Sequence, residues 1–329
     1  MTANRKVNLF YEQPDNDRWI AFDRYPRRVI RRIVRGKRRP GGHDLVFLNL
    51  RKGLDQLGID YRVNDYRHLR KHPEEIACVI GKPHVVDKIP PRTAILFGAA
   101  QFSHPDEQPG FFAQHQNIRK ILVPGEWVRQ MWEPYFGKKV AAWPVGIDTE
   151  AWGHRKSVKD VDFLLYDKLY RAGVDFEAEL VAPIVKCLTD RGASFHRLRY
   201  GSYTDEEFSE LLNRSRAMIF LCEHETQGIA YQQALASGVP MLAYDRAGFW
   251  TDPNFFPHIA EFAPVSSVPY WDARCGMKFT SAEDFEARVD EFIRKRNDYD
   301  PRGYILENLT LEKCAARYLE FVAEVQSTG

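Results

Sequence analysis

A carboxylate and a glycine turn stand between a strand-like segment and a helix-like one in MIFLCEHETQGIAYQQALASGVPMLAYD, residues 218–245. The apolar run before Glu225 predicts a buried strand, and a helix is predicted to begin at Ile229, directly after Gly228. The first N–H groups of a helix lack partners within it and, together with the helix dipole, attract phosphate. Glu225 would reach the group attached to that phosphate. A nucleoside-diphosphate sugar fits such a site.

Strand and helix patterns alternate along the whole chain, which predicts parallel sheets covered by helices on both faces. In the first half, strands are expected at residues 7–11, 60–63, 77–80, 94–97 and 120–123, and helices at 45–57 and 127–136. In the second half, strands are expected at 161–166, 195–200, 217–222 and 240–244, and helices at 176–191, 205–215, 229–237, 282–296 and 311–325.

These two blocks predict an α/β protein of two Rossmann-like domains that face a central cleft. The expected divisions are an N-terminal acceptor domain (1–147), a donor-binding domain (148–310) and a C-terminal helix (311–329). The C-terminal helix is expected to pack back on the N-terminal domain.

The segment around Glu225 resembles the donor-binding motif of the retaining, metal-independent glycosyltransferases of the GT-B fold (glycosyl transferases group 1). That Glu-x7-Glu motif has a Glu, a Gly three residues later, a second Glu eight residues later, and then Gly-x-Pro. This chain has Glu225, Gly228, Gln233 and Gly238-Val239-Pro240 in those places. The resemblance implies that Glu225 holds hydroxyl groups of the donor sugar. The family's second Glu binds the ribose, so a neutral Gln233 implies weaker or altered nucleotide binding.

Two flanking segments extend the resemblance. In DFLLYDKLYRAG, residues 162–173, Lys168 stands where the family has an Arg for the diphosphate. The family's following Lys is replaced by Gly173, and Arg171 is the nearest other cation. His104 follows a predicted strand, where the family often has an active-site His. The resemblance thus implies two catalytic residues, Glu225 and His104, and a donor-binding set of Lys168, Arg171, Gln227, Gly228, Ile229 and Gln233.

A pair of glycines and two acidic patterns complete the candidates. Gly41 and Gly42 precede the first long helix and would let the backbone approach a ligand in the interdomain cleft. Residues 15–17 and 298–300 read as Asp-x-Asp, the metal-binding pattern of the other glycosyltransferase fold, but neither follows a suitable strand. We therefore expect no metal site, and no cofactor apart from the nucleoside-diphosphate sugar as substrate.

Residues 24–39 hold nine Lys or Arg and no acidic residue. Their apolar residues recur at helical spacing, which favours a basic amphipathic helix on an anionic membrane surface. A solvated loop explains the same segment equally well. We expect no nucleic-acid partner, because the formal net charge is only +2 and aromatic interleaving is absent. No apolar run is long enough to span a bilayer, so the expected location is the cytoplasm, with peripheral binding to the inner membrane face.

The expected reaction is transfer of a sugar from the nucleoside-diphosphate donor to a hydroxyl of a saccharide or lipid-linked acceptor, with retention and without metal, in polysaccharide or glycolipid assembly. Two alternatives remain open. A sugar-nucleotide epimerase would keep the fold and change the reaction. A catalytically impaired sugar-nucleotide-binding protein would account for Gln233 and for the cation missing at position 173.

Overall fold

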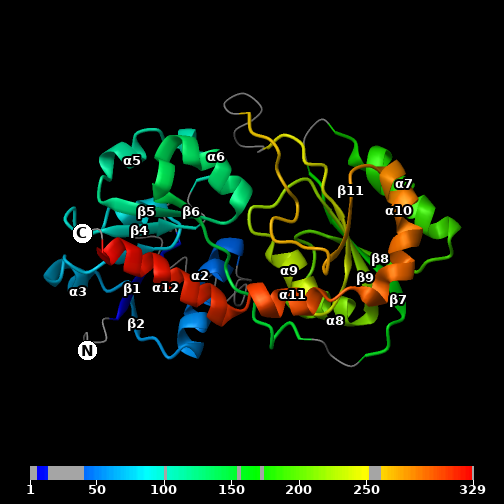
Figure 1. Ribbon diagram of the computed structural model, residues 1–329, viewed down its shortest axis with the longest axis horizontal. Coiled ribbons are helices and arrows are strands. Elements are labelled where there is room, and N and C mark those ends of the chain that lie inside the picture. Colours follow the sequence, from blue (N-terminus) through cyan, green and yellow to red (C-terminus); the bar gives the residue numbers. More distant parts are fainter. Residues whose placement is uncertain are drawn as a thin grey trace, which may run out of the picture.

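The computed structural model describes residues 6–13, 41–99, 102–153, 157–170, 174–251 and 261–327. Within these ranges the chain forms two α/β units, each built on one parallel sheet (Figure 1). The expected fold class is therefore confirmed. None of the helices in the described ranges has the length and apolar character needed to cross a membrane.

The first unit contains a six-stranded parallel sheet in the order β2-β1-β3-β4-β5-β6. Its strands are β1 (Val7–Phe10), β2 (Tyr61–Val63), β3 (Ala77–Val79), β4 (Ile95–Gly98), β5 (Ile118–Val123) and β6 (Val140–Ala142). Its helices are α2 (Gly42–Gln56), α3 (Tyr66–Lys71), α4 (Pro83–Val86), α5 (Phe111–Gln114) and α6 (Glu126–Phe136). Successive strand residues point to opposite faces, so Leu96 packs with the α2 side and Phe97 with the α6 side.

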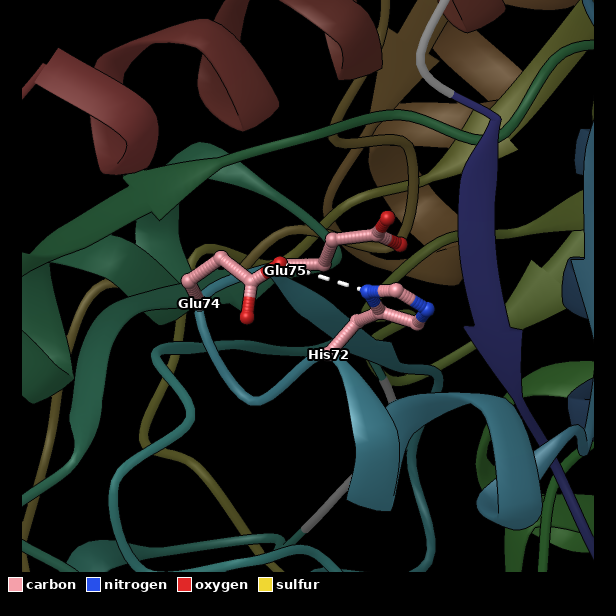
Figure 2. A group of neighbouring side chains, drawn as sticks. All are labelled: His72, Glu74 and Glu75. Carbon is pink, nitrogen blue, oxygen red and sulfur yellow. Dashed lines mark ion pairs between the residues drawn. The ribbon is translucent and has the colours of Figure 1, made fainter.

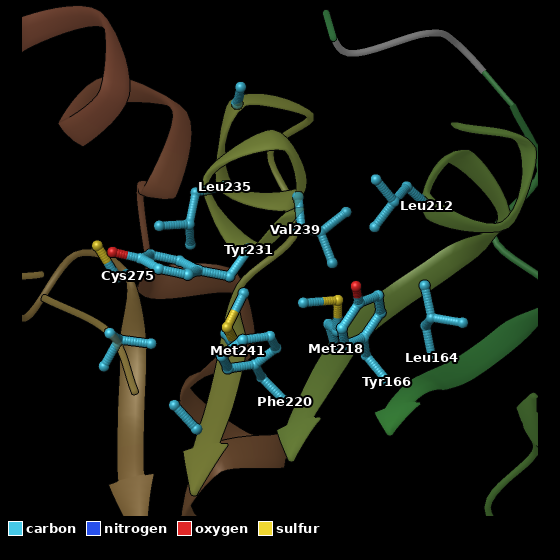
Figure 3. Close-up of a cluster of buried hydrophobic side chains, with 14 of the residues drawn as sticks. Leu164, Tyr166, Leu212, Met218, Phe220, Tyr231, Leu235, Val239, Met241 and Cys275 are labelled. Atoms are coloured by element: carbon cyan, nitrogen blue, oxygen red, sulfur yellow. The ribbon is translucent and has the colours of Figure 1, made fainter. Parts of the chain in front are cut away.

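The second unit contains a five-stranded parallel sheet in the order β11-β10-β9-β7-β8. Its strands are β7 (Val161–Lys168), β8 (Phe195–Arg199), β9 (Ser215–Cys222), β10 (Met241–Tyr244) and β11 (Gly276–Phe279). Its helices are α7 (Ala182–Asp190), α8 (Asp205–Arg214), α9 (Ile229–Ala236), α10 (Ala282–Lys295) and α11 (Pro301–Asn308). Figure 3 shows the core between the sheet and α9, where the rings of Tyr231 and Phe220 lie 5.6 Å apart. This core anchors α9 against the strands that lead into the Glu225 segment.

Each strand predicted from the sequence is present, and two more edge strands join the sheets. The additional strands β6 and β11 have three and four residues, VAA and GMKF, and such short segments carry little periodicity. Gly58 follows the predicted helix 45–57 and has a left-handed backbone with φ +67°, and Gly137 follows the predicted helix 127–136 and has φ +54°. The predicted ends of these helices, at residues 57 and 136, agree with the observed ends at Gln56 and Phe136.

The C-terminal helix α12 (Leu311–Ser327) packs on the first unit beside α2 (Figure 1). The indole N–H of Trp143 donates to the carbonyl of Cys314 at 2.9 Å, and a backbone bridge pairs Ile147 with Thr310. The chain therefore leaves the first unit and returns to it at neighbouring points. The domain boundaries at residues 147/148 and 310/311 stay predictions.

The close approach of α2 and α12 gives a stability prediction for Gly53. A Cβ at Gly53 would press on the carbonyl oxygen of Leu311 and lie 2.8 Å from the Cβ of Ala315. In an open helix Gly→Ala would stabilise by about 1 kcal/mol. Here we expect Gly53→Ala to destabilise by about 2 kcal/mol, because α12 must move away from a packed surface. Denaturant unfolding measures this.

Gly42→Ala is the control, because it lies in the first turn of the same helix with no atom within 4 Å of the added Cβ. It should leave stability unchanged or raise it. Equal destabilisation by both substitutions would contradict the close packing of α2 and α12.

Candidate active site

Lys168 and Glu225 meet at the carboxyl edge of the second sheet. Strands β7 and β9 are parallel neighbours, with Lys168 opposite Cys222, and Glu225 follows three residues after β9 ends. Their side chains form an ion pair with Nζ 2.5 Å from Oε1, and each is only 14% exposed. The two residues that the sequence predicted for sugar and for diphosphate are therefore adjacent.

The pair is electrostatically coupled and only partly open to solvent. Burial of the ammonium acts to lower the pKa of Lys168, but the nearby Glu225 carboxylate reverses this and raises the pKa above its ordinary value. The ammonium also lies 4.6 Å from the ring centre of Tyr200, a cation–π contact. Tyr200 follows β8 and is 55% exposed, so one aromatic surface borders the ion pair and solvent. Lys168 is a fixed positive charge at neutral pH.

The amino end of α9 lies directly after the Glu225 segment. Gly228 is the N-cap residue with φ +74°, and a Cβ there would overlap the ring of Tyr231, so both the backbone and the space require glycine. Within the described chain no side chain caps this first turn. Ile229 and Ala230 are half-buried and not sealed in the core. Unpartnered N–H groups at such a position form a seat for an anion.

Three glutamines of the motif occupy different environments. The Gln227 side chain is buried: its Oε1 accepts from the backbone N–H of Val145, and its Nε2 donates to Gln232. Gln232 is fully buried and donates back to the Gln227 carbonyl at 2.7 Å. Gln233 is half-buried, and within the described chain its side-chain amide has no hydrogen-bond partner. Gln233 is thus free to meet a ligand, whereas the Gln227 amide bonds to protein.

His104 lies in the first unit, in an aromatic contact with the second. Its ring is 3% exposed and stacks on Trp250 at 5.6 Å, with Tyr135 edge-on at 5.5 Å. Its Nδ1 accepts from the backbone N–H of Asp106 at 3.1 Å. Burial lowers the pKa of His104, which favours the neutral ring. A catalytic role for His104 stays a prediction.

The other predicted residues divide into described and undescribed ones. Gly41 is the N-cap of α2, and its N–H donates to Asp44 at 2.9 Å. A Cβ added at Gly42 would meet no atom within 4 Å, and one added at Gly41 would meet only the Asp44 side chain, at 3.6 Å. Arg171 and the basic residues 24–39 lie outside the described ranges. Their predicted roles in diphosphate and membrane binding stay predictions from the sequence.

A separate group of possible metal ligands lies after α3. Figure 2 shows His72, Glu74 and Glu75, whose ligand atoms all lie within 4.8 Å of one another. However, Oε2 of Glu75 accepts from Asn8 at 2.9 Å and lies 2.9 Å from Nε2 of His68. That carboxylate oxygen already has protein partners, and through them Glu75 links α3 to β1.

A concavity of about 490 Å³ opens along the edge strand β8. Its lining includes Arg197 and Glu177, and Arg197 also pairs with buried Asp167 at 2.6 Å. Asp167 and Lys168 are consecutive strand residues and point to opposite sides of the sheet. The ion pair with Glu225 therefore does not belong to this concavity.

Residues of the first unit also hold the Glu225 segment, and no sequence pattern pointed to them. The indole N–H of Trp127 donates to the Glu225 carbonyl at 2.8 Å. A second bond joins the two units elsewhere, since the Tyr270 hydroxyl donates to the Pro124 carbonyl at 2.5 Å. In the sequence Trp127 is an ordinary apolar position of a helix, so only the packing of the two units reveals this role.

Comparison with solved structures agrees with this architecture, although neither a protein-family model nor a curated protein matches the sequence. AviGT4, described as a glycosyltransferase involved in avilamycin A biosynthesis, is similar with a TM-score of 0.56 at 15% identity over 98% of each chain. The lipopolysaccharide outer core galactosyltransferase WaaB is similar with a TM-score of 0.55 at 12% identity, over 97% of this chain and 99% of its own. A TarM variant from S. aureus, solved with fondaparinux, α-GlcNAc-glycerol and UDP, has a TM-score of 0.52 at 12% identity, over 78% of this chain and 58% of its own.

At such low identities the likeness establishes the fold. The chain has the two-sheet α/β architecture of GT-B glycosyltransferases along nearly its whole length. Fold alone leaves the reaction open, so function has to be argued from the site.

Proposed function

We propose that this protein is a glycosyltransferase that moves a sugar from a nucleoside-diphosphate donor to a hydroxyl group of a saccharide or lipid-linked acceptor. The observation that carries the proposal is the Lys168–Glu225 ion pair beside the uncapped amino end of α9. A cation, a helix dipole and a carboxylate together match the diphosphate and hydroxyl groups of a sugar nucleotide. Shared architecture with AviGT4 and WaaB supports the same class of reaction.

In this proposal the diphosphate lies against the first turn of α9 and the ammonium of Lys168, with Arg171 as a further cation. These groups stabilise negative charge as the diphosphate departs, so the reaction proceeds without a divalent metal. Glu225 exchanges its partner Lys168 for hydroxyl groups of the sugar. Gln233 binds the ribose through a neutral amide. Retention of the anomeric configuration is part of the proposal and rests on the resemblance of the motif.

The acceptor side of the proposal involves the first unit. Gly41 and Gly42 leave space at the amino end of α2, and His104 would contact the sugar from the first unit. Assembly of a polysaccharide or glycolipid is the role that the similar structures favour, since WaaB is described as a lipopolysaccharide outer core galactosyltransferase. Contact of residues 24–39 with an anionic membrane rests on the sequence.

A panel of donors tests the function. Binding of UDP-, GDP- and dTDP-sugars is measured by calorimetry, and turnover by release of the nucleoside diphosphate with and without saccharide acceptors. We expect one nucleotide series to bind and its diphosphate to be released faster with an acceptor. A changed sugar nucleotide without acceptor would indicate the epimerase. Binding without turnover for every acceptor would indicate a sugar-nucleotide-binding protein, and no binding at all would refute the proposal.

A further inference from the structure

The backbone of the Glu225 segment is held between two parts of the protein. The N–H of Glu225 donates to the carbonyl of Ser266 at 2.9 Å, which lies in the segment between β10 and β11. Its carbonyl accepts from the indole N–H of Trp127 at 2.8 Å, from the first turn of α6 in the other unit. Both hydrogen-bonding groups of this residue's backbone are therefore satisfied, one from each side. The two contacts fix the backbone from which the Glu225 side chain extends.

The next two residues are also contacted by the first unit. A Cβ at Gly125 would lie 2.7 Å from the Thr226 carbonyl oxygen, so the start of α6 touches the backbone of the segment. The buried Gln227 side chain accepts from the backbone of Val145 at 3.1 Å. Three consecutive residues thus contact the first unit, through a hydrogen bond, a close packing contact and a second hydrogen bond.

We infer that Trp127 is a positioning residue which couples contact between the two units to the grip of Glu225 on the donor sugar. The inference rests on the proposed function and adds a residue to it. When the units are together, Trp127 holds the Glu225 carbonyl and the carboxylate points to Lys168. When they separate, this hydrogen bond breaks while Lys168 and α9, which lie in the second unit, keep the diphosphate seat.

This arrangement gives a specific expectation for binding. The nucleoside diphosphate contacts only groups of the second unit, so its affinity should not depend on Trp127. The donor sugar is bound by Glu225, which Trp127 positions. The contribution of the sugar to donor affinity and to turnover should therefore depend on Trp127. Substitution of a residue that merely stabilises the fold would change both the diphosphate affinity and the contribution of the sugar, or neither of them.

The chain offers a matched control in the same helix. Trp132 is also on α6 and fully buried, and within the described residues its indole N–H has no hydrogen-bond partner. Trp127→Phe and Trp132→Phe therefore remove the same group and the same ring volume, but only the first breaks the bond to Glu225. Gly125→Ala is a second test, because its added methyl must push the Thr226 backbone away.

The experiment measures kcat/KM together with two Kd values, one for a nucleoside diphosphate and one for its sugar conjugate. The probes are UDP with UDP-glucose, GDP with GDP-mannose, or dTDP with dTDP-glucose. The donor panel decides which of these pairs is used. For Trp127→Phe we expect the diphosphate Kd to stay within about 2-fold and kcat/KM to fall roughly 10-fold or more, as for one lost buried hydrogen bond. Gly125→Ala should act in the same direction and increase the radius of gyration in X-ray scattering. Trp132→Phe should change neither the diphosphate Kd nor kcat/KM.

Equal kinetics for the two Trp→Phe variants would overturn the inference. So would a parallel loss of diphosphate affinity in Trp127→Phe, since that would mean a general disturbance of the site. If the wild-type protein binds none of the probes, the proposed function fails and the positioning role fails with it. If the wild type turns over and Trp127→Phe is unaffected, only the positioning role fails.

Discussion

Glu225→Gln is expected to lower kcat/KM for sugar transfer by about 100-fold. The reason is that a carboxylate accepts hydrogen bonds from sugar hydroxyl groups with the assistance of its charge, and the neutral amide keeps the shape but loses that charge. Glu225→Asp provides the comparison, because it keeps a negative charge for Lys168 but withdraws the carboxylate by one methylene. It should fold with near-normal stability and also lose turnover.

The matched control is Glu223→Gln, a buried carboxylate two residues earlier that lies 3.4 Å from Arg246. Turnover is measured by release of the nucleoside diphosphate at a temperature well below the Tm of every variant, so that unfolding does not contribute. We expect Glu223→Gln to keep most of the activity. Wild-type kcat/KM in Glu225→Gln would remove Glu225 from the donor site.

Lys168→Met is expected to destabilise the protein by about 3 kcal/mol. The substitution leaves the carboxylate of Glu225 without its partner, in a place where both side chains are only 14% exposed. Removing one partner of a buried ion pair lowers the free energy of unfolding because the other charge stays buried without compensation. For a unit of this size the Tm falls by roughly 6–12 °C. Diphosphate affinity should fall as well, because the cation is lost.

The double variant Lys168→Met with Glu225→Gln separates the two effects. With both charges removed, no uncompensated charge remains, so the double variant should be more stable than Lys168→Met alone. Lys186→Met, in an exposed pair with Asp190, is the control and should give no resolvable change in Tm. Additive losses in the double variant would show that the ion pair is not coupled.

Much of the second unit followed from local pattern. The apolar run before Glu225, the glycine at position 228 and the Gly-x-Pro after α9 predicted strand, turn, helix and strand in the right order. Periodicity and turn chemistry are local properties, so they can be recognised within a window of a dozen residues. The conformation of Gly228 confirms that prediction, and the ring of Tyr231 adds a second reason for glycine.

Other parts of the site could not be predicted locally. The sequence placed Lys168 and Glu225 in one site through a family resemblance, whereas their contact arises because β7 pairs with β9, although β8 lies between them along the chain. Strand order depends on pairing between segments that lie far apart along the chain, and no window of sequence contains it. The hydrogen bond from the Val145 N–H to Gln227 could not be predicted from the sequence either, since the two residues are 82 positions apart.

Local preferences of the chain were enough to predict the α/β class and the longer elements, because strand, helix and turn preferences act over a few residues. The short edge strands β6 and β11 and the short helices α3, α4, α5 and α11 were not predicted. The pairing of Glu225 with Lys168, and the hold of Trp127 on a backbone 98 residues after it, arise only in the folded protein. Those contacts depend on tertiary packing. Packing brings together residues whose separation along the chain follows no fixed rule, so a sequence pattern does not reveal them.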